Sequence, residues 1–89
     1  MTFHVETTRR FDKQLKKLDN FTAKTILKWL DKNIEGVNNP RTFGKPLVGN
    51  HSGKWRYRIG DYRVITKIDD KKLIILALEV GHRKDIYKN

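Results

Sequence analysis

One ten-residue stretch, Lys54 to Arg63, has the residue types and spacing most suited to chemistry on an anion. It reads KWRYRIGDYR, and every second residue of its first half is basic. Because side chains alternate across a β-strand, Arg56 and Arg58 should share one face. Trp55 and Tyr57 should lie on the opposite face, in the core. A guanidinium is a planar fork that binds phosphate through two hydrogen bonds and keeps its charge, so the pattern predicts a phosphate-binding strand face.

The same stretch should fold back on itself as a β-hairpin. Gly60 and Asp61 form a typical two-residue turn, because glycine readily adopts the positive φ that such turns need. The resulting register places Arg58 directly opposite Arg63. Like charges in that position destabilise a sheet, so we interpret Arg56, Arg58 and Arg63 as a site for an anionic ligand, with Lys54 and Lys67 at its ends. The alternative is a solvated strand face whose cations only promote solubility.

The composition agrees with an anionic partner. The chain has 89 residues and a formal net charge of +10, from 20 Lys and Arg against 10 Asp and Glu. The segment 36–63 alone holds six basic residues and one acidic residue, a local charge of +5. Such an excess points to nucleic acid, an anionic surface or an acidic protein. A chain of this length is expected to form one domain.

Several other classes of function find no support in the residues. The chain has no cysteine, which excludes disulfides and thiolate metal sites and favours a cytoplasmic location. Its three histidines are too scattered to predict a metal site, and no Gly-rich phosphate loop is present. The apolar run 73–78 has the length of a strand, and the first six residues are too few and too polar for a secretory signal. We therefore expect no metal, no cofactor and no membrane partner.

The segment that follows the last predicted strand adds a second group of candidate residues. It reads GHRKDIY and ends at Tyr87. His82 is a candidate proton carrier, because imidazole titrates near neutral pH; the alternative is a surface histidine without a role. Tyr87 can stack on a nucleobase or donate a proton from its phenol; the alternative is an aromatic residue that closes the core.

Hydrophobic periodicity and turn residues predict the elements that position these groups. Phe3 and Val5 alternate with polar residues, and apolar residues at helical spacing follow. Asn20 or Thr22 is expected to cap the second helix. The expected elements are a strand near 3–5, helices at about 8–18 and 20–35, a loop at 36–53, hairpin strands at 54–59 and 62–68, and a last strand at 73–80. The last strand is almost continuously apolar, as in a central strand buried on both faces.

The order β-α-α-β-β-β gives the fold class. We expect a single α+β domain over residues 1–89, in which a helical hairpin packs on a mostly antiparallel four-stranded sheet. The last strand should lie beside the strand 62–68, so that the C-terminal segment leaves the sheet next to the arginines. This arrangement would gather the guanidinium groups on one surface beside His82 and Tyr87.

Taken together, these residues resemble a known family. Over nearly its whole length the chain is similar to the RelE/ParE superfamily of bacterial and archaeal type II toxins, most closely to the RelE branch. The signatures WRYRIGDYR and VGHRKDIY carry the likeness. The resemblance implies a RelE-like fold and an mRNA interferase, a ribosome-dependent endoribonuclease that cuts the mRNA codon in the A site and inhibits translation. It also implies a cognate RelB-like antitoxin that wraps around the toxin.

The resemblance further implies roles for single residues. Arg63 matches an arginine that stabilises the scissile phosphate, and Arg83 matches a second arginine that contacts it. Tyr87 matches an aromatic residue that stacks on a base and assists the chemistry. Arg56 and Arg58 stand at basic positions that are lysines in the best-known relative, where a lysine transfers a proton.

The resemblance leaves the proton carrier open. Arginine is a poor proton carrier at neutral pH, which gives more weight to His82, a position that other relatives also place near the site. His82 or Tyr87 would shuttle protons while the ribose 2′-OH attacks the phosphate without a metal. Further RNA contacts are expected from Lys54 and His51 and from the helix lysines Lys13, Lys16, Lys17, Lys24, Lys28 and Lys32. For His51 the alternative is a loop histidine without a role.

Two other functions fit parts of the sequence. A ParE-like inhibitor of DNA gyrase would share the fold, but such relatives generally lack the full set of His82, Arg83 and Tyr87. A catalytically degenerate protein that binds RNA or an antitoxin would fit the replacement of lysine by arginine at positions 56 and 58. The complete C-terminal set favours the nuclease.

Overall fold

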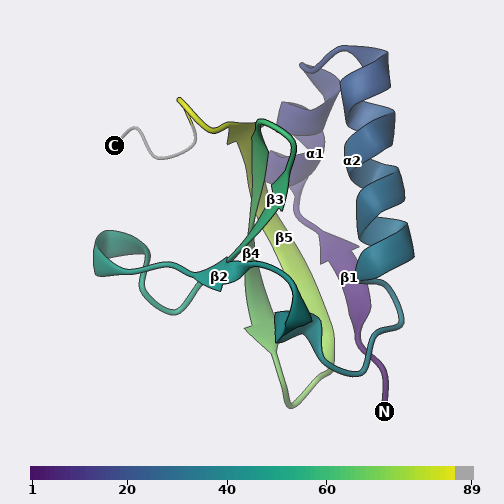
Figure 1. Ribbon diagram of the computed structural model, residues 1–89, viewed down its shortest axis with the longest axis vertical. Coiled ribbons are helices and arrows are strands. Elements are labelled where there is room, and N and C mark those ends of the chain that lie inside the picture. Colours follow the sequence, from purple (N-terminus) through teal and green to yellow (C-terminus); the bar gives the residue numbers. More distant parts are fainter. Residues whose placement is uncertain (86–89) are drawn as a thin grey trace.

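Two helices pack on one face of a five-stranded sheet in the computed structural model, which describes residues 1–85 (Figure 1). The strand order is β1-β5-β4-β3-β2; β1 runs parallel to β5, and the other neighbours are antiparallel. The strands are β1 (His4–Thr7), β2 (Lys45–Pro46), β3 (Trp55–Ile59), β4 (Tyr62–Asp69) and β5 (Ile74–His82), and the helices are α1 (Arg9–Lys16) and α2 (Asn20–Asn33). The predicted α+β fold is confirmed.

The sheet has one strand more than the four that the sequence predicts. β2 lies inside the segment 36–53 that was expected to be a loop, and it pairs with β3 through only Lys45 and Pro46. Two short 3-10 turns, Pro40–Thr42 and Gly49–His51, flank it. A strand of two residues shows no alternation of polar and apolar side chains, so periodicity could not reveal it.

Each helix begins at a side-chain cap. Thr8 caps α1, and its hydroxyl accepts a hydrogen bond from the Phe11 backbone N–H at 3.2 Å. Asp19 caps α2, and its carboxylate accepts from the Thr22 N–H at 3.0 Å. The predicted cap at Asn20 or Thr22 is wrong, because Asp19 already has the extended backbone of a cap and Asn20 is helical. Within residues 1–85, neither helix is long and apolar enough to span a membrane.

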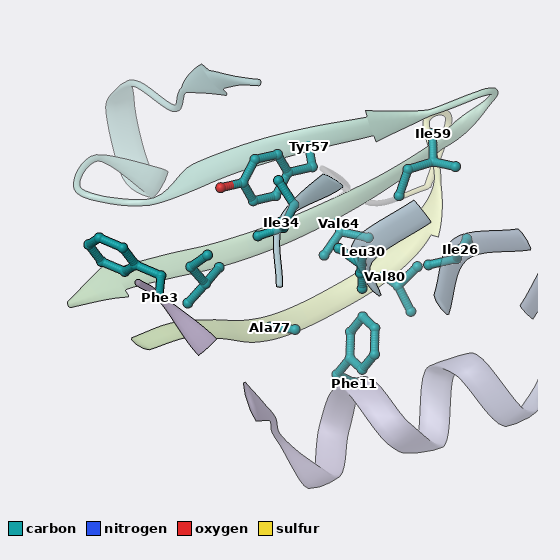
Figure 2. Close-up of a cluster of buried hydrophobic side chains, with 11 residues drawn as sticks. Phe3, Phe11, Ile26, Leu30, Ile34, Tyr57, Ile59, Val64, Ala77 and Val80 are labelled. Atoms are coloured by element: carbon teal, nitrogen blue, oxygen red, sulfur yellow. The ribbon is translucent and has the colours of Figure 1, made fainter. Parts of the chain in front are cut away.

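The helices and the sheet enclose one hydrophobic core (Figure 2). Phe11 of α1 and Leu30 of α2 are buried in it, and Val64 lines it from β4. Tyr57 of β3 is fully buried, and its hydroxyl donates to the Pro40 carbonyl at 2.6 Å. This hydrogen bond ties the segment before β2 to the sheet. The inward face predicted for β3 is therefore confirmed at Tyr57.

β5 carries the chain toward the candidate site and contains an irregularity. Ile75 and Ala77, two residues apart, are buried in the core. The register between β4 and β5 then shifts, and the next buried residue is Val80, three residues after Ala77. The shift inserts one residue into the alternation of β5, as a β-bulge does. The other face of β5 is only half-buried, so the expected burial on both faces holds for one face alone. The strand also runs on to His82, two residues beyond its predicted end.

Candidate functional site

Three arginines share the sheet face that points away from the helices, which we call the basic face. Arg58 of β3 is directly opposite Arg63 of β4, which confirms the hairpin register. Arg56 shares their face, because residues i and i+2 of a strand point the same way. Tyr57, between Arg56 and Arg58, points into the core instead. The fold thus brings Arg56, Arg58 and Arg63 onto one surface.

The three guanidinium groups have different surroundings. Arg63 is only 7% exposed, and its Nη1 donates to the Tyr62 carbonyl at 3.4 Å. Arg56 is half-buried, and its buried Nε has no hydrogen-bond partner among residues 1–85. Arg58 is exposed. A buried donor without an acceptor is destabilising, so an anion that reaches Arg56 would form a hydrogen bond that the described fold leaves open.

Another cation, Lys45, lies on the basic face, and the sequence pattern did not reveal it. Lys45 of β2 pairs with Arg56 of β3, so the two side chains point to the same face. Lys45 is exposed. Its placement depends on a strand of only two residues, inside a segment whose Pro and Gly content indicates a loop. Arg58 and Arg63 form a first row of the basic face, and Lys45 and Arg56 form a second row. The exposed Lys67, two residues after Ile65 on β4, shares the face beyond the second row.

A carboxylate at the far end of the second row is already paired. Glu79 of β5 is opposite Ile65 of β4, and Ile65 is opposite Arg56. The Glu79 carboxylate lies 3.2 Å from the Arg10 guanidinium of α1. Its charge is therefore compensated on the helix side, and Ile65 separates it from Arg56. The described part of the chain has no cluster of three His, Asp or Glu residues that could bind a metal ion.

The register places His82 on the other side of the sheet. His82 is opposite Tyr62, the neighbour of Arg63 in β4, and the two rings meet edge to face with centroids 5.5 Å apart. Successive residues of a strand alternate in direction, so His82 and Arg63 point to opposite faces. The expectation that His82 shares the arginines' surface is wrong, because the bulge in β5 reverses which of the last residues face the core. The backbone of His82 is nevertheless close to Arg63, because the preceding residue, Gly81, is directly opposite Arg63.

The chain turns immediately after β5. The Lys84 N–H donates to Nδ1 of His82 at 3.2 Å, which needs an unprotonated Nδ1 and leaves the proton of a neutral ring on Nε2. The Arg83 N–H donates to the Asp61 carbonyl at 2.8 Å, so the exposed Arg83 is held at the tip of the hairpin. Tyr87, the last of the predicted catalytic residues, lies outside the described residues.

The remaining residues predicted to bind RNA lie elsewhere. Six exposed lysines lie on the helices, in the layer that covers the opposite side of the sheet: Lys13, Lys16, Lys17, Lys24, Lys28 and Lys32. Lys54 and His51 are half-buried in the segment before β3, and Lys54 lines a shallow pocket beside Trp55 and Arg41. The predicted RNA contacts are thus divided between the basic face, this segment and the helix layer.

Comparison with known proteins finds relatives over almost the whole chain. The family model for the ParE toxin of type II toxin-antitoxin system, parDE, matches residues 5–87. The chain is 29% identical to Toxin RelE of Mycobacterium tuberculosis over 86 residues, which cover 97% of this chain and 87% of that toxin. It is 41% identical to Toxin RelG of the same bacterium over 49 residues, or 55% of this chain. That match spans only 56% of the length of RelG.

A solved structure shares the fold. The crystal structure of the toxin-antitoxin complex RelBE2 from Mycobacterium tuberculosis matches with a TM-score of 0.78 and 26% sequence identity. The match covers 93% of this chain and 100% of the other chain. The likeness therefore extends across both helices and the sheet that carries the basic face.

Proposed function

This chain belongs to the ParE toxin family of type II toxin–antitoxin systems, within the RelE/ParE superfamily, and on that basis we propose that it is a ribosome-dependent endoribonuclease. Its substrate is the mRNA codon in the ribosomal A site, and cleavage there stops translation. The observation that carries the proposal is the pairing of Arg58 with Arg63 on one sheet face, with Arg56 beside them.

The first row suits the charge that develops when a phosphodiester is cleaved. The pentacoordinate transition state carries more negative charge on its oxygens than the ground state, and preorganised cations stabilise that extra charge. Two guanidinium forks, those of Arg58 and Arg63, can each bind non-bridging oxygens through paired hydrogen bonds. Arg63 is almost fully buried, where a charge is screened less by water than at an open surface.

The proposed reaction is an internal transesterification of RNA. The ribose 2′-oxygen attacks the adjacent phosphorus, the bond between phosphorus and the 5′-oxygen breaks, and the products are a 2′,3′-cyclic phosphate and a 5′-hydroxyl. One group accepts the 2′-proton and another protonates the departing 5′-oxygen. The reaction requires a 2′-hydroxyl, which restricts the substrate to RNA.

We propose that His82 or Tyr87 transfers the protons, with Arg83 as a further phosphate contact. The hydrogen bond to Asp61 holds Arg83 at the hairpin tip, next to the end of the first row. His82 faces the helices, so its ring can serve the phosphate only by reaching around the end of β5. Because His82 faces away from the basic face, we favour Tyr87 as the proton carrier more strongly than the sequence alone does.

A protein antitoxin and the ribosome are the proposed partners. The matched crystal structure is that of a toxin–antitoxin complex, which supports a RelB-like antitoxin for this chain. A net charge of +10 favours association with an acidic or amphipathic antitoxin segment and with ribosomal RNA. The function requires the cytoplasm, where translation takes place.

Inhibition of DNA gyrase is the second candidate, because the matching family model is that of the ParE toxins. Expression of the chain in cells, followed by mapping of mRNA 5′ ends, separates the two functions. Codon-phased cuts within translated messages are expected for the nuclease. Intact messages with stalled replication would favour the gyrase inhibitor. Intact messages with normal replication would leave a degenerate protein that only binds RNA or an antitoxin.

A further inference from the structure

We propose that Lys45 and Arg56 form a second phosphate subsite, which binds the phosphate next to the one that is cleaved. This subsite rests on the proposed function, because it extends the same basic face. In the proposed reaction, cleavage requires Arg58 and Arg63 of the first row. Lys45 takes no part in the reaction itself. The second row holds the RNA in register, so Lys45 is a positioning residue and not a catalytic one.

The two rows have the spacing of neighbouring phosphates. Arg56 and Arg58 are two residues apart on β3, which separates the rows by about 7 Å. Successive phosphates of an extended RNA strand are separated by a distance of the same order. An RNA whose scissile phosphate lies at Arg58 and Arg63 therefore brings its neighbouring phosphate to Lys45 and Arg56.

The second row lacks an acceptor that a phosphate would supply. The buried Nε of Arg56 has no hydrogen-bond partner among the described residues, and Lys45 lies directly opposite as a second cation. Such a like-charge pair is unfavourable until an anion lies between the two groups. Glu79 does not meet this need, because it pairs with Arg10 and is separated from Arg56 by Ile65.

Lys45 has a defined position because the preceding residue packs against β3. Gly44 has a φ of +84°, and a Cβ there would lie 2.2 Å from the Arg56 carbonyl oxygen. On the N-terminal side of Gly44, the indole Nε1 of Trp55 donates to the Phe43 carbonyl at 2.8 Å. Only glycine allows this close approach at that φ. Lys45 is therefore fixed opposite Arg56 and does not have the freedom of an ordinary loop lysine.

The test compares two short RNAs whose 2′-oxygens are methylated, so that neither can be cleaved. A dinucleotide has one phosphodiester and reports on the first row, whereas a trinucleotide has two and reports on both rows. By NMR titration, we expect Lys45→Gln to weaken trinucleotide binding roughly threefold to tenfold and dinucleotide binding less than about twofold. The matched control Lys71→Gln removes the same charge from the exposed β4–β5 turn and should change neither affinity.

Two further measurements separate the subsite from the proposed function. The Nε–H signal of Arg56 should shift with the trinucleotide and stay in place with the dinucleotide, and Arg63→Gln should weaken binding of both RNAs. The second subsite is overturned if Lys45→Gln weakens binding of the two RNAs equally, or weakens binding of neither. This holds even if Arg63→Gln weakens binding of both RNAs. Wild-type binding of both RNAs by folded Arg63→Gln contradicts the proposed function itself.

A pair of glycine variants tests the positioning of Lys45. Gly44→Ala should reproduce the loss of trinucleotide affinity seen in Lys45→Gln, because the added Cβ displaces β2 from β3. Gly49→Ala is the control, since Gly49 also has a positive φ, +67°, but a Cβ there meets nothing within 4 Å. Circular dichroism establishes that both variants fold. Equal trinucleotide affinities for the two variants would contradict the fixed position; if Gly44→Ala fails to fold, the result for Lys45→Gln decides.

Discussion

At the scale of single residues, the basic face combines two features that a stable sheet avoids. Arg58 and Arg63 carry like charges in directly opposed positions, which weakens strand pairing. Arg63 is also almost fully buried, whereas arginine side chains in folded proteins are mostly exposed. The proposed anion site accounts for both features, because its groups would be arranged for a ligand and not for the stability of the free protein.

This interpretation predicts a gain in stability when the first row loses a charge. Arg58→Thr removes the like-charge pair and introduces a residue that suits a strand, so the free energy of unfolding should rise by about 0.5 kcal/mol. Urea denaturation measures the change, and the same variant should lose cleavage activity. A less stable Arg58→Thr protein would show that Arg58 contributes to the fold.

A second substitution tests whether the shape of the guanidinium matters in addition to its charge. Arg63→Lys keeps the charge but loses the planar fork, so the cleavage rate on ribosomes should fall on the order of 10²-fold, close to the loss for Arg63→Ala. Lys71→Ala, in an exposed turn, is the control and should cleave at the wild-type rate. Full activity of Arg63→Lys would show that only the positive charge at position 63 matters, and not the planar shape of the guanidinium.

At the scale of elements, the sequence predicts the features that periodicity and turn residues encode, and it misses a very short strand and a β-bulge. The two-residue turn at Gly60 and Asp61 determines the hairpin register, so the pairing of Arg58 with Arg63 follows from a short stretch of sequence. β2 has only two residues, so its sequence shows no alternation that would predict a strand or the position of Lys45. The direction of His82 depends on a bulge in β5, which composition does not reveal.

A carboxylate ties β1 to the segment after α2 and provides a pH-dependent test of the fold. Glu35 accepts from the Val5 N–H at 2.8 Å and lies 2.6 Å from Nδ1 of His4. The hydrogen bond from Val5, followed by that from His4, lowers the pKa of Glu35 below its ordinary value of 4.5. A carboxyl group with a lowered folded-state pKa stabilises the fold above its unfolded pKa and loses that contribution as the pH falls through the folded pKa.

Glu35→Gln should therefore be less stable than the wild type at neutral pH, by less than about 1 kcal/mol because the site is partly exposed. The difference should shrink as the pH falls below 4.5, where the wild-type carboxyl itself takes up a proton. Urea denaturation of both proteins at neutral and acidic pH measures it. A difference that stays constant with pH would show that packing, and not the charge of Glu35, is responsible.

At the scale of the whole molecule, positive charge is divided between two sides of the sheet. The basic face lies on one side, and the exposed helix lysines lie on the other. The sequence shows the excess of charge and its concentration in residues 36–63. The layered fold separates lysines and arginines that the sequence analysis assigned together to RNA contacts. The proposed function assigns the two sides to different polyanions, the mRNA phosphate at the basic face and ribosomal RNA at the helix layer.

This division predicts that the two surfaces can be impaired separately. A variant with Lys13, Lys16 and Lys17 replaced by Gln should bind ribosomes more weakly and with less dependence on salt, because fewer counterions are released. Its affinity for the methylated dinucleotide should stay within about twofold of the wild type, since that RNA needs only the first row. Sedimentation with ribosomes and NMR titration provide the two measurements. Equal losses in both would mean that the helix layer and the basic face form one binding surface.

The most direct test is the chemistry of the cut on programmed ribosomes. The purified chain is added to ribosomes that hold a labelled mRNA with an empty A site, and the ends of the product are analysed. We predict cleavage within the A-site codon by the wild type, with a 2′,3′-cyclic phosphate and a 5′-hydroxyl at the new ends, and a rate at least about 10²-fold lower for Arg63→Ala. Intact mRNA in the presence of the folded wild-type chain, or cleavage by Arg63→Ala at the wild-type rate, would contradict the central claim.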